Sequence, residues 1–124
     1  MPTVRKLIPT EDQEQIALAT WLTKQGIRFY AIANGGKRNL REAVKLKRTG
    51  LSPGVPDICI PIPSGCYHGL YIELKRERGG RVSNEQVEWL EFLRSKGYWA
   101  DVAFGFEDAK KIVLYYLQLT KPAA

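Results

Sequence analysis

Apolar residues recur at the period of a helix in three parts of the chain. The first part begins at Thr10, which forms the pattern of a capping box with Gln13, and it ends at Gly26. The second part spans residues 83–96 and the third spans residues 107–119. Each has an apolar stripe on one side, as expected for a helix that covers a core. The pattern therefore predicts three amphipathic helices.

Four other stretches are rich in β-branched and aromatic residues and lie between turn-forming residues. They are residues 27–34, 54–63, 68–75 and 98–104. Such stretches predict strands, and the prolines within residues 54–63 indicate an edge strand or a strand end. A basic stretch at residues 37–48 is predicted as a helix or an irregular helical segment. This order of elements predicts an α/β (α+β) fold, in which helices pack on a small central mixed β-sheet.

Length and composition indicate one globular domain, residues 1–124. Hydrophobic residues make up 44% of the chain and the mean hydropathy is −0.28, which argues against disorder. No apolar run is long enough to span a membrane and no signal peptide is recognised, so no membrane partner is expected. Cys59, Cys66 and His68 are too few for a disulfide framework or a zinc pattern. A reducing location is therefore expected, in the cytoplasm, or in the host-cell cytoplasm if the protein is viral.

The charge is positive and unevenly distributed. The formal net charge is +6, and residues 37–48 contain six basic side chains against one acid, Glu42. The basic residues are Lys37, Arg38, Arg41, Lys45, Lys47 and Arg48. A cluster of this density indicates a polyanionic partner, and these side chains are candidates for contact with the DNA backbone. A solvated helix face explains the charge run alone equally well.

Two strands each carry a carboxylate. The alternation of a strand places Glu73 and Lys75 on one face of residues 68–75, and pairing with the preceding strand can bring Asp57 beside Glu73. Two adjacent carboxylates repel each other, and a bound divalent cation such as Mg²⁺ removes that cost. An adjacent lysine can help to activate water and offset negative charge on a phosphate. A Glu-x-Lys triplet alone is most often a solvated face, and Asp57 alone could be a turn residue.

The two motifs together resemble a known signature. Pro56-Asp57 and Glu73-Leu74-Lys75 match the PD-(D/E)xK nuclease pattern. The wider sequence, including "NGGKR", "GLSPGVPDI", "HGLYIELKRERGGRVSNEQ" and "GYWADVAFGFEDA", resembles the virus-type replication-repair nuclease (VRR-NUC) domain over nearly the whole chain. The resemblance implies a restriction-endonuclease-like fold, dependence on Mg²⁺ or Mn²⁺, and cleavage of DNA that leaves 5′-phosphates.

The resemblance also implies roles for individual residues. Asp57 and Glu73 would be metal ligands, with the Leu74 carbonyl as a third, and Lys75 would be the catalytic lysine. Members of this family place a further glutamate on the first helix.

That helical glutamate is Glu11 or Glu14, and we favour Glu11 because it stands four residues before Gln15, as the family pattern suggests. A first-turn acid is also favoured by the helix dipole, which explains Glu11 without a site. Gln86 matches a recurrent glutamine of the family that would lie beside the site. Gln86 is equally explained as the third helical residue of a capping box with Ser83.

We therefore expect a metal-dependent DNA endonuclease without a small-molecule cofactor. A minimal domain without a separate element for reading bases favours shape-selective cutting of branched DNA, as in a Holliday-junction resolvase. Symmetric cutting of a four-way junction requires two sites, which predicts a homodimer. The alternatives are a flap, nicking or restriction-type nuclease of the same fold, and a non-catalytic DNA-binding module.

Overall fold

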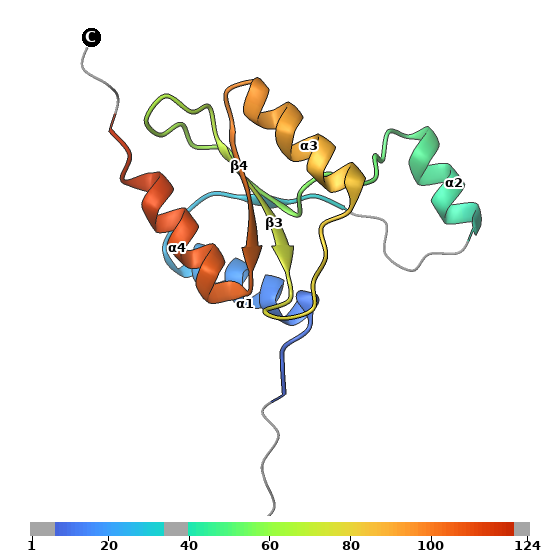
Figure 1. Cartoon of the computed structure of the whole chain (residues 1–124), viewed down its shortest axis with the longest axis horizontal. Coiled ribbons are helices and arrows are strands. Elements are labelled where there is room, and N and C mark those ends of the chain that lie inside the picture. Colours follow the sequence, from blue (N-terminus) through green and yellow to red (C-terminus); the bar gives the residue numbers. More distant parts are fainter. Residues whose placement is uncertain (1–6, 34–39, 121–124) are drawn as a thin grey trace, which may run out of the picture.

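The computed structural model describes residues 7–33 and 40–120, and its elements follow the predicted order (Figure 1). The helices and strands are α1 (Glu11–Lys24), β1 (Tyr30–Ala31), α2 (Leu40–Arg48), β2 (Ile58–Ile60), β3 (Leu70–Lys75), α3 (Asn84–Ser95), β4 (Trp99–Phe104) and α4 (Phe106–Leu117). Thr10 caps α1 and Ser83 caps α3, each with the predicted capping box. The predicted turn at residues 34–36, together with Lys37 and Arg38, lies outside the described residues.

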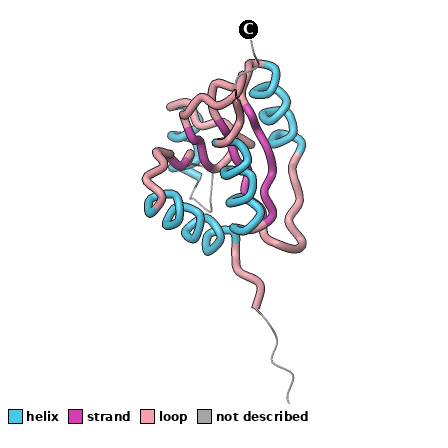
Figure 2. The backbone as a smooth tube through the Cα atoms, turned by 90° about the vertical axis from the view of Figure 1, so that its left-hand side faces the viewer, coloured by secondary structure: helices cyan, strands magenta, loops and turns pink. Residues whose placement is uncertain are grey.

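The strands form one mixed sheet in the order β1-β2-β3-β4. The pairs β1–β2 and β2–β3 are antiparallel, whereas β3 and β4 run parallel and are joined through α3. Helices cover both faces of this sheet, with the strands between them (Figure 2). The prediction of a small mixed sheet flanked by helices is confirmed.

The first two strands are shorter than predicted. Only two residues of the stretch 27–34 and three residues of the stretch 54–63 pair as strands. The N–H of Ile27 is bonded to the carbonyl of Leu22, so Ile27 belongs to the end of the first helix rather than to a strand. Pro56 and Pro61 flank β2, and a proline has no N–H to contribute to a strand ladder.

The larger hydrophobic core lies between the sheet and the pair α1 and α4. Leu18 and Leu22 from α1, Val113 and Tyr116 from α4, and Ile72 from β3 are fully buried there. A smaller cluster packs α3 on the other face. Because both faces of the sheet are covered, β3 is buried on both sides. The alternative reading of Glu73 and Lys75 as a solvated strand face therefore does not hold, because both side chains are buried.

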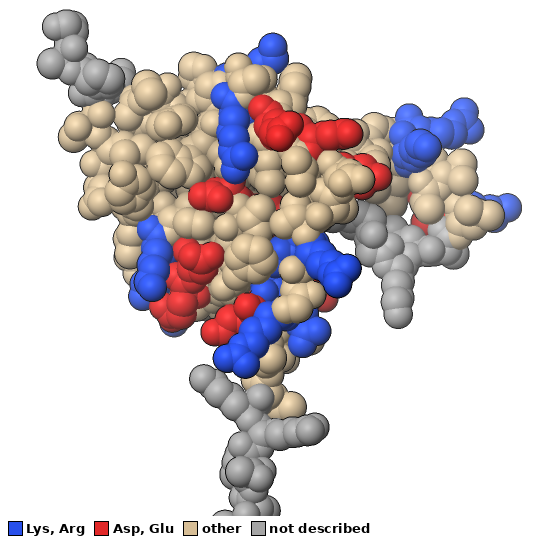
Figure 3. All heavy atoms as spheres, viewed as in Figure 1, with Lys and Arg blue, Asp and Glu red and all other residues tan. Residues whose placement is uncertain are grey.

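Helix α2 stands apart from the sheet (Figure 1). It buries none of its residues, and even Leu40 is 81% exposed. Basic side chains gather on its surface (Figure 3). This helix therefore contributes charge and shape to the surface rather than packing energy. Within residues 7–33 and 40–120, no helix is both long enough and apolar enough to cross a membrane.

Candidate active site

The register of β2 and β3 places Asp57 opposite Glu73. Ile58 pairs with Ile72, so the next residue outward on β2 faces the next residue on β3. The N–H of Asp57 donates to the carbonyl of Ile72 at 3.0 Å, and the Asp57 Oδ2 accepts the N–H of Leu74 at 2.7 Å. The Asp57 side chain thus extends the row of hydrogen bonds between β2 and β3 by one more bond. Backbone pairing and the side-chain hydrogen bond together fix this carboxylate beside β3.

Glu73 is a buried carboxylate whose two oxygens differ. The residue is only 2% exposed. Its Oε1 accepts a hydrogen bond from the Gln86 Nε2 at 2.6 Å, whereas its Oε2 is buried and has no hydrogen-bond partner among the described residues. Burial, and next the negative charge of Asp57, raise the pKa of Glu73 from 4.5 to about 8. A buried oxygen without a partner is costly, so it calls for an explanation such as a bound ion.

Lys75 lies between two carboxylates. Its Nζ is 3.5 Å from the Glu73 Oε1 and 3.9 Å from the Glu11 Oε1. The residue is 8% exposed, so little water screens these interactions. The Lys75 charge lowers the pKa of Glu73, but less than burial and Asp57 raise it. The strand thus places a cation beside Glu73, where its charge partly offsets that of the two carboxylates.

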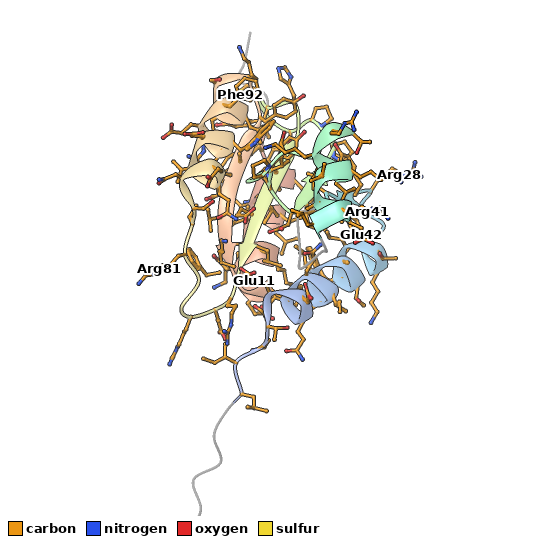
Figure 4. The ribbon with its side chains drawn as sticks, turned by 90° about the vertical axis from the view of Figure 1, so that its right-hand side faces the viewer. Glu11, Arg28, Arg41, Glu42, Arg81 and Phe92 are labelled. Atoms are coloured by element: carbon orange, nitrogen blue, oxygen red, sulfur yellow. The ribbon has the colours of Figure 1, made fainter. Side chains whose placement is uncertain are left out.

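The structure separates the two glutamates of the first helix. Glu11 lies at the start of α1 (Figure 4), and its Oε1 is 3.9 Å from the Lys75 Nζ. Glu14 is buried and points elsewhere, since its Oε2 accepts the N–H of Phe106, the first residue of α4, at 2.8 Å. The N-cap of α4 is Gly105, which has no side chain, so Glu14 provides the cap from another helix. Of the two candidates, only Glu11 reaches the cavity.

Gln86 caps α3 and also contacts Glu73. Its Oε1 accepts the N–H of Ser83 at 2.8 Å, which completes the capping box of α3. Its Nε2 donates to Glu73 at the same time. A Cβ on Gly54 would lie 2.5 Å from the backbone of Glu85, so the loop before β2 packs directly on the first turn of α3. The helix start is therefore held in place beside the buried carboxylate.

These side chains surround a cavity of about 680 Å³. Every residue predicted for catalysis or metal binding lines it: Glu11, Asp57, Glu73, Leu74, Lys75 and Gln86. Asp12 and Gln15 of α1 also line the cavity, and they were not predicted as site residues. The signal for Gln15 was its position one helical turn after Glu11, which puts both on the same face of α1.

The donor set suits a hard divalent cation. Among the described residues, no group of three or more His, Cys, Asp or Glu side chains is arranged to hold a metal. Asp57 and Glu73 nevertheless offer two carboxylates, and the carbonyl of Leu74, the residue after Glu73, is a third oxygen that lines the same cavity. Mg²⁺ is commonly bound by one or two carboxylates, with water and substrate phosphate completing its coordination. The unpartnered Oε2 of Glu73 fits this role.

Comparison with known proteins agrees with this geometry. Residues 9–107 match the VRR-NUC domain. The chain belongs to the VRR-NUC family. A solved structure described as a VRR_NUC domain protein is 29% identical and superposes with a TM-score of 0.80, over 94% of this chain and 95% of that chain. No match was found among curated proteins.

Membership of the VRR-NUC family defines the fold and the broad activity. The fold is restriction-endonuclease-like, and the domain is a nuclease domain of the PD-(D/E)xK type. Nuclease activity implies DNA as the substrate. The PD-(D/E)xK motif of this chain consists of Pro56-Asp57 and Glu73-Leu74-Lys75. Its residues Asp57, Glu73, Leu74 and Lys75 line the cavity described above.

The predicted DNA-contacting residues of the VRR-NUC domain divide into two groups. Lys47 lines the cavity, whereas Arg41, Lys45 and Arg48 surround a shallow hollow on the other side of α2. The helical period separates these groups, because positions 41, 45 and 48 share one side of α2. Lys37 and Arg38 lie outside the described residues.

Proposed function

We propose that this VRR-NUC protein is a Mg²⁺-dependent (or Mn²⁺-dependent) DNA endonuclease that cuts branched DNA, with the four-way junction as its preferred substrate. The observation that carries the proposal is the buried, unpartnered Oε2 of Glu73 beside Asp57. Two carboxylates in this position destabilise the protein unless a cation neutralises them. A site that only supported the fold would have no need of this arrangement.

The residues of the cavity divide the work of binding a cation. Asp57, Glu73 and the Leu74 carbonyl would hold it, and when bound it would act as a Lewis acid toward a phosphate and a water molecule. The N–H of Leu74 orients the Asp57 carboxylate. Gln86 occupies the Oε1 of Glu73 and leaves the Oε2 available.

Lys75 supplies positive charge to the same cavity. Its Nζ can orient an attacking water and offset the negative charge that develops on the phosphate during hydrolysis. The Oε1 of Glu11, on α1, lies 3.9 Å from this ammonium group. Because Lys75 is nearly buried, its charge acts at short range with little screening by solvent.

Branched DNA is proposed because the cavity is flanked by backbone-binding charge and no separate element for reading bases has been recognised. Positively charged side chains bind phosphates irrespective of sequence, so they recognise the shape of the DNA. Paired nicks in opposite strands of a junction require two active sites related by a two-fold axis. We therefore propose a homodimer.

The test uses purified protein with linear, flapped and four-way-junction DNA, in Mg²⁺, in Mn²⁺ and in EDTA. The variants are Asp57→Asn and, as a matched control, Asp101→Asn, whose side chain accepts the N–H of Val102 on β4 and can still do so as an amide. Wild type and Asp101→Asn should cut when a divalent metal ion is present and not in EDTA, while Asp57→Asn should not cut under any of these conditions. Analytical ultracentrifugation gives the oligomeric state.

Each possible result has a clear meaning. Symmetric paired nicks confined to junctions support the proposal in full. Cleavage of flaps, single nicks or linear DNA instead would replace it with a flap, nicking or restriction-type nuclease. If the wild type binds DNA but cuts none of these substrates with either metal, the protein is a DNA-binding module and the proposal is wrong.

A further inference from the structure

The connection between β3 and α3 carries a second group of cations. Residues 76–82 contain Arg76, Arg78 and Arg81, all exposed, with Glu77 as the only acid. Within residues 7–33 and 40–120, none of these three guanidinium groups forms an ion pair. Their charge is thus not neutralised by neighbouring side chains. We call residues 76–82 the arginine loop.

The arginine loop packs beside Lys75, which lines the cavity. It begins directly after Lys75, and Gly79 has a φ of +80°, which lets the chain turn back. A Cβ on Gly80 would lie 2.9 Å from the Cβ of Lys75, so the backbone of the loop packs on the stem of this lysine. The loop position is therefore tied to the active site.

The arginine loop and α2 lie on opposite sides of the site. In Figure 4, Arg81 of the loop appears on one side of Glu11 and Arg41 of α2 on the other. Figure 3 shows basic side chains both on α2 and in the region of the loop, near the start of α1. Two cationic flanks thus border a cavity whose floor is acidic.

An acidic floor explains why two flanks are useful. Glu11, Asp12, Asp57 and Glu73 all line the cavity, and their charge repels a phosphodiester backbone. Cations on one side alone would pull the DNA away from the cavity toward that side. Cations on both sides hold the backbone over the centre, and arginine suits phosphate because it can donate two parallel hydrogen bonds.

We infer that the arginine loop is a second phosphate-binding flank, so that DNA spans the cavity with one part of its backbone on α2 and another on Arg76, Arg78 and Arg81. The inference rests on the proposed function, since it assumes a DNA substrate, and it adds a set of contacts that the pattern of residues 37–48 did not indicate. Both flanks bind the same DNA molecule at the same time.

The test is the salt dependence of DNA binding, measured in EDTA by fluorescence anisotropy with a labelled junction and a labelled duplex. The loop variant is Arg76→Gln/Arg78→Gln/Arg81→Gln. Its matched control, Lys24→Gln/Lys96→Gln/Lys111→Gln, removes the same charge from exposed positions at the far ends of α1 and α3 and on α4. Circular dichroism checks that each variant is folded.

Each phosphate contact contributes about 0.9 to the slope of log K against log salt concentration for duplex DNA. Loss of three contacts should therefore reduce the slope by about 2 to 3 in the loop variant, while the control keeps the wild-type slope. An unchanged slope in the loop variant overturns the inference. Equal reductions in both variants also overturn it, because they would show only the effect of net charge.

A second comparison tests whether the flanks act together. The α2 variant Lys47→Gln, which removes the cation of α2 that lines the cavity, should lower the slope by about 0.9, and its combination with the loop variant should lower it by the sum of the two effects. A combined effect no larger than either single effect contradicts simultaneous binding. If the wild type binds no DNA, the proposed function itself fails. If the wild type binds and cuts DNA but the loop variant keeps the wild-type salt slope, only this inference is refuted.

Discussion

The Nε2 of Gln86 donates a hydrogen bond to the Oε1 of Glu73 at 2.6 Å, while the Oε1 of the same amide accepts the N–H of Ser83. One side chain thus links the start of α3 to a buried carboxylate of β3. The capping box fixes the position of the amide, and the amide fixes one oxygen of Glu73. Helix capping and the geometry of the candidate site are therefore coupled through a single residue.

This coupling predicts different effects for three substitutions. Ser83→Ala removes the cap and should lower the free energy of unfolding by about 1 kcal/mol, with cleavage retained. Gln86→Glu can still accept the Ser83 N–H but places a negative charge against Glu73, so cleavage should fall at least about tenfold, the equivalent of one lost hydrogen bond to a charged group. Gln86→Ala should show both defects. Urea unfolding and initial cleavage rates measure them.

The prediction fails if Gln86→Glu cuts DNA at the wild-type rate. A control is Glu88→Gln, an exposed substitution in the next turn of α3. It should leave both the stability and the rate unchanged, because Glu88 faces solvent rather than the cavity.

The two glutamates of α1 should separate stability from activity. Glu14→Ala removes the group that caps α4 and should lower the free energy of unfolding by about 1 to 2 kcal/mol. Glu11→Ala removes a cavity-lining carboxylate and should slow cleavage with a smaller loss of stability. The two variants are matched because both shorten a glutamate to alanine on the same helix. If both variants lose the same stability and the same activity, the assignment of separate roles to Glu11 and Glu14 is wrong.

Much of this architecture could be predicted because local signals agreed with the final packing. The capping boxes at Thr10 and Ser83 marked helix starts correctly, and strand alternation correctly placed Glu73 and Lys75 together. The antiparallel pairing of β2 with β3 was needed to place Asp57 opposite Glu73, and a short connection between two strands made it a reasonable expectation.

The remaining features depend on contacts between distant parts of the chain. The sequence could not distinguish Glu11 from Glu14, because the choice depends on where the start of α4 packs, 92 residues after Glu14. It could not show that β3 is covered on both faces, because that depends on α3 crossing to one side of the sheet. The arginine loop was overlooked because its charges surround a turn rather than form a continuous basic run.

Lys75 should be needed for cleavage but not for metal binding. Lys75→Met keeps the length and apolar stem of the side chain while removing its charge, and Asp57 and Glu73 remain in place. Loss of a group that stabilises developing charge reduces rates by about 100-fold or more. Mg²⁺ should still raise the melting temperature of this variant. A control, Lys111→Met on the exposed side of α4, should cut normally, and loss of the Mg²⁺ effect in Lys75→Met would contradict the separation of roles.

The raised pKa of Glu73 predicts how the metal-free protein responds to pH. Its pKa is about 8 when folded against 4.5 for an ordinary glutamate, so between these values the folded state binds more protons than the unfolded state. The free energy of unfolding in EDTA should therefore fall as the pH rises from about 4.5 to about 8, by up to about 1.4 kcal/mol for each unit of pKa difference.

Substitution of Glu73 isolates its share of this pH dependence. The side chain at position 73 cannot ionise in Glu73→Gln, so the free energy of unfolding of this variant should fall much less as the pH rises. Glu91→Gln, an exposed change on α3, should show the same fall as the wild type. Mg²⁺ favours the charged carboxylate, so it should stabilise the wild type more at pH 8 than at pH 5 and stabilise Glu73→Gln little at either. Urea unfolding at both pH values, with EDTA or with Mg²⁺, gives the free energy of unfolding of each protein under each condition. If the decline persists undiminished in Glu73→Gln, another group causes it and the raised pKa of Glu73 does not govern the stability of the metal-free protein.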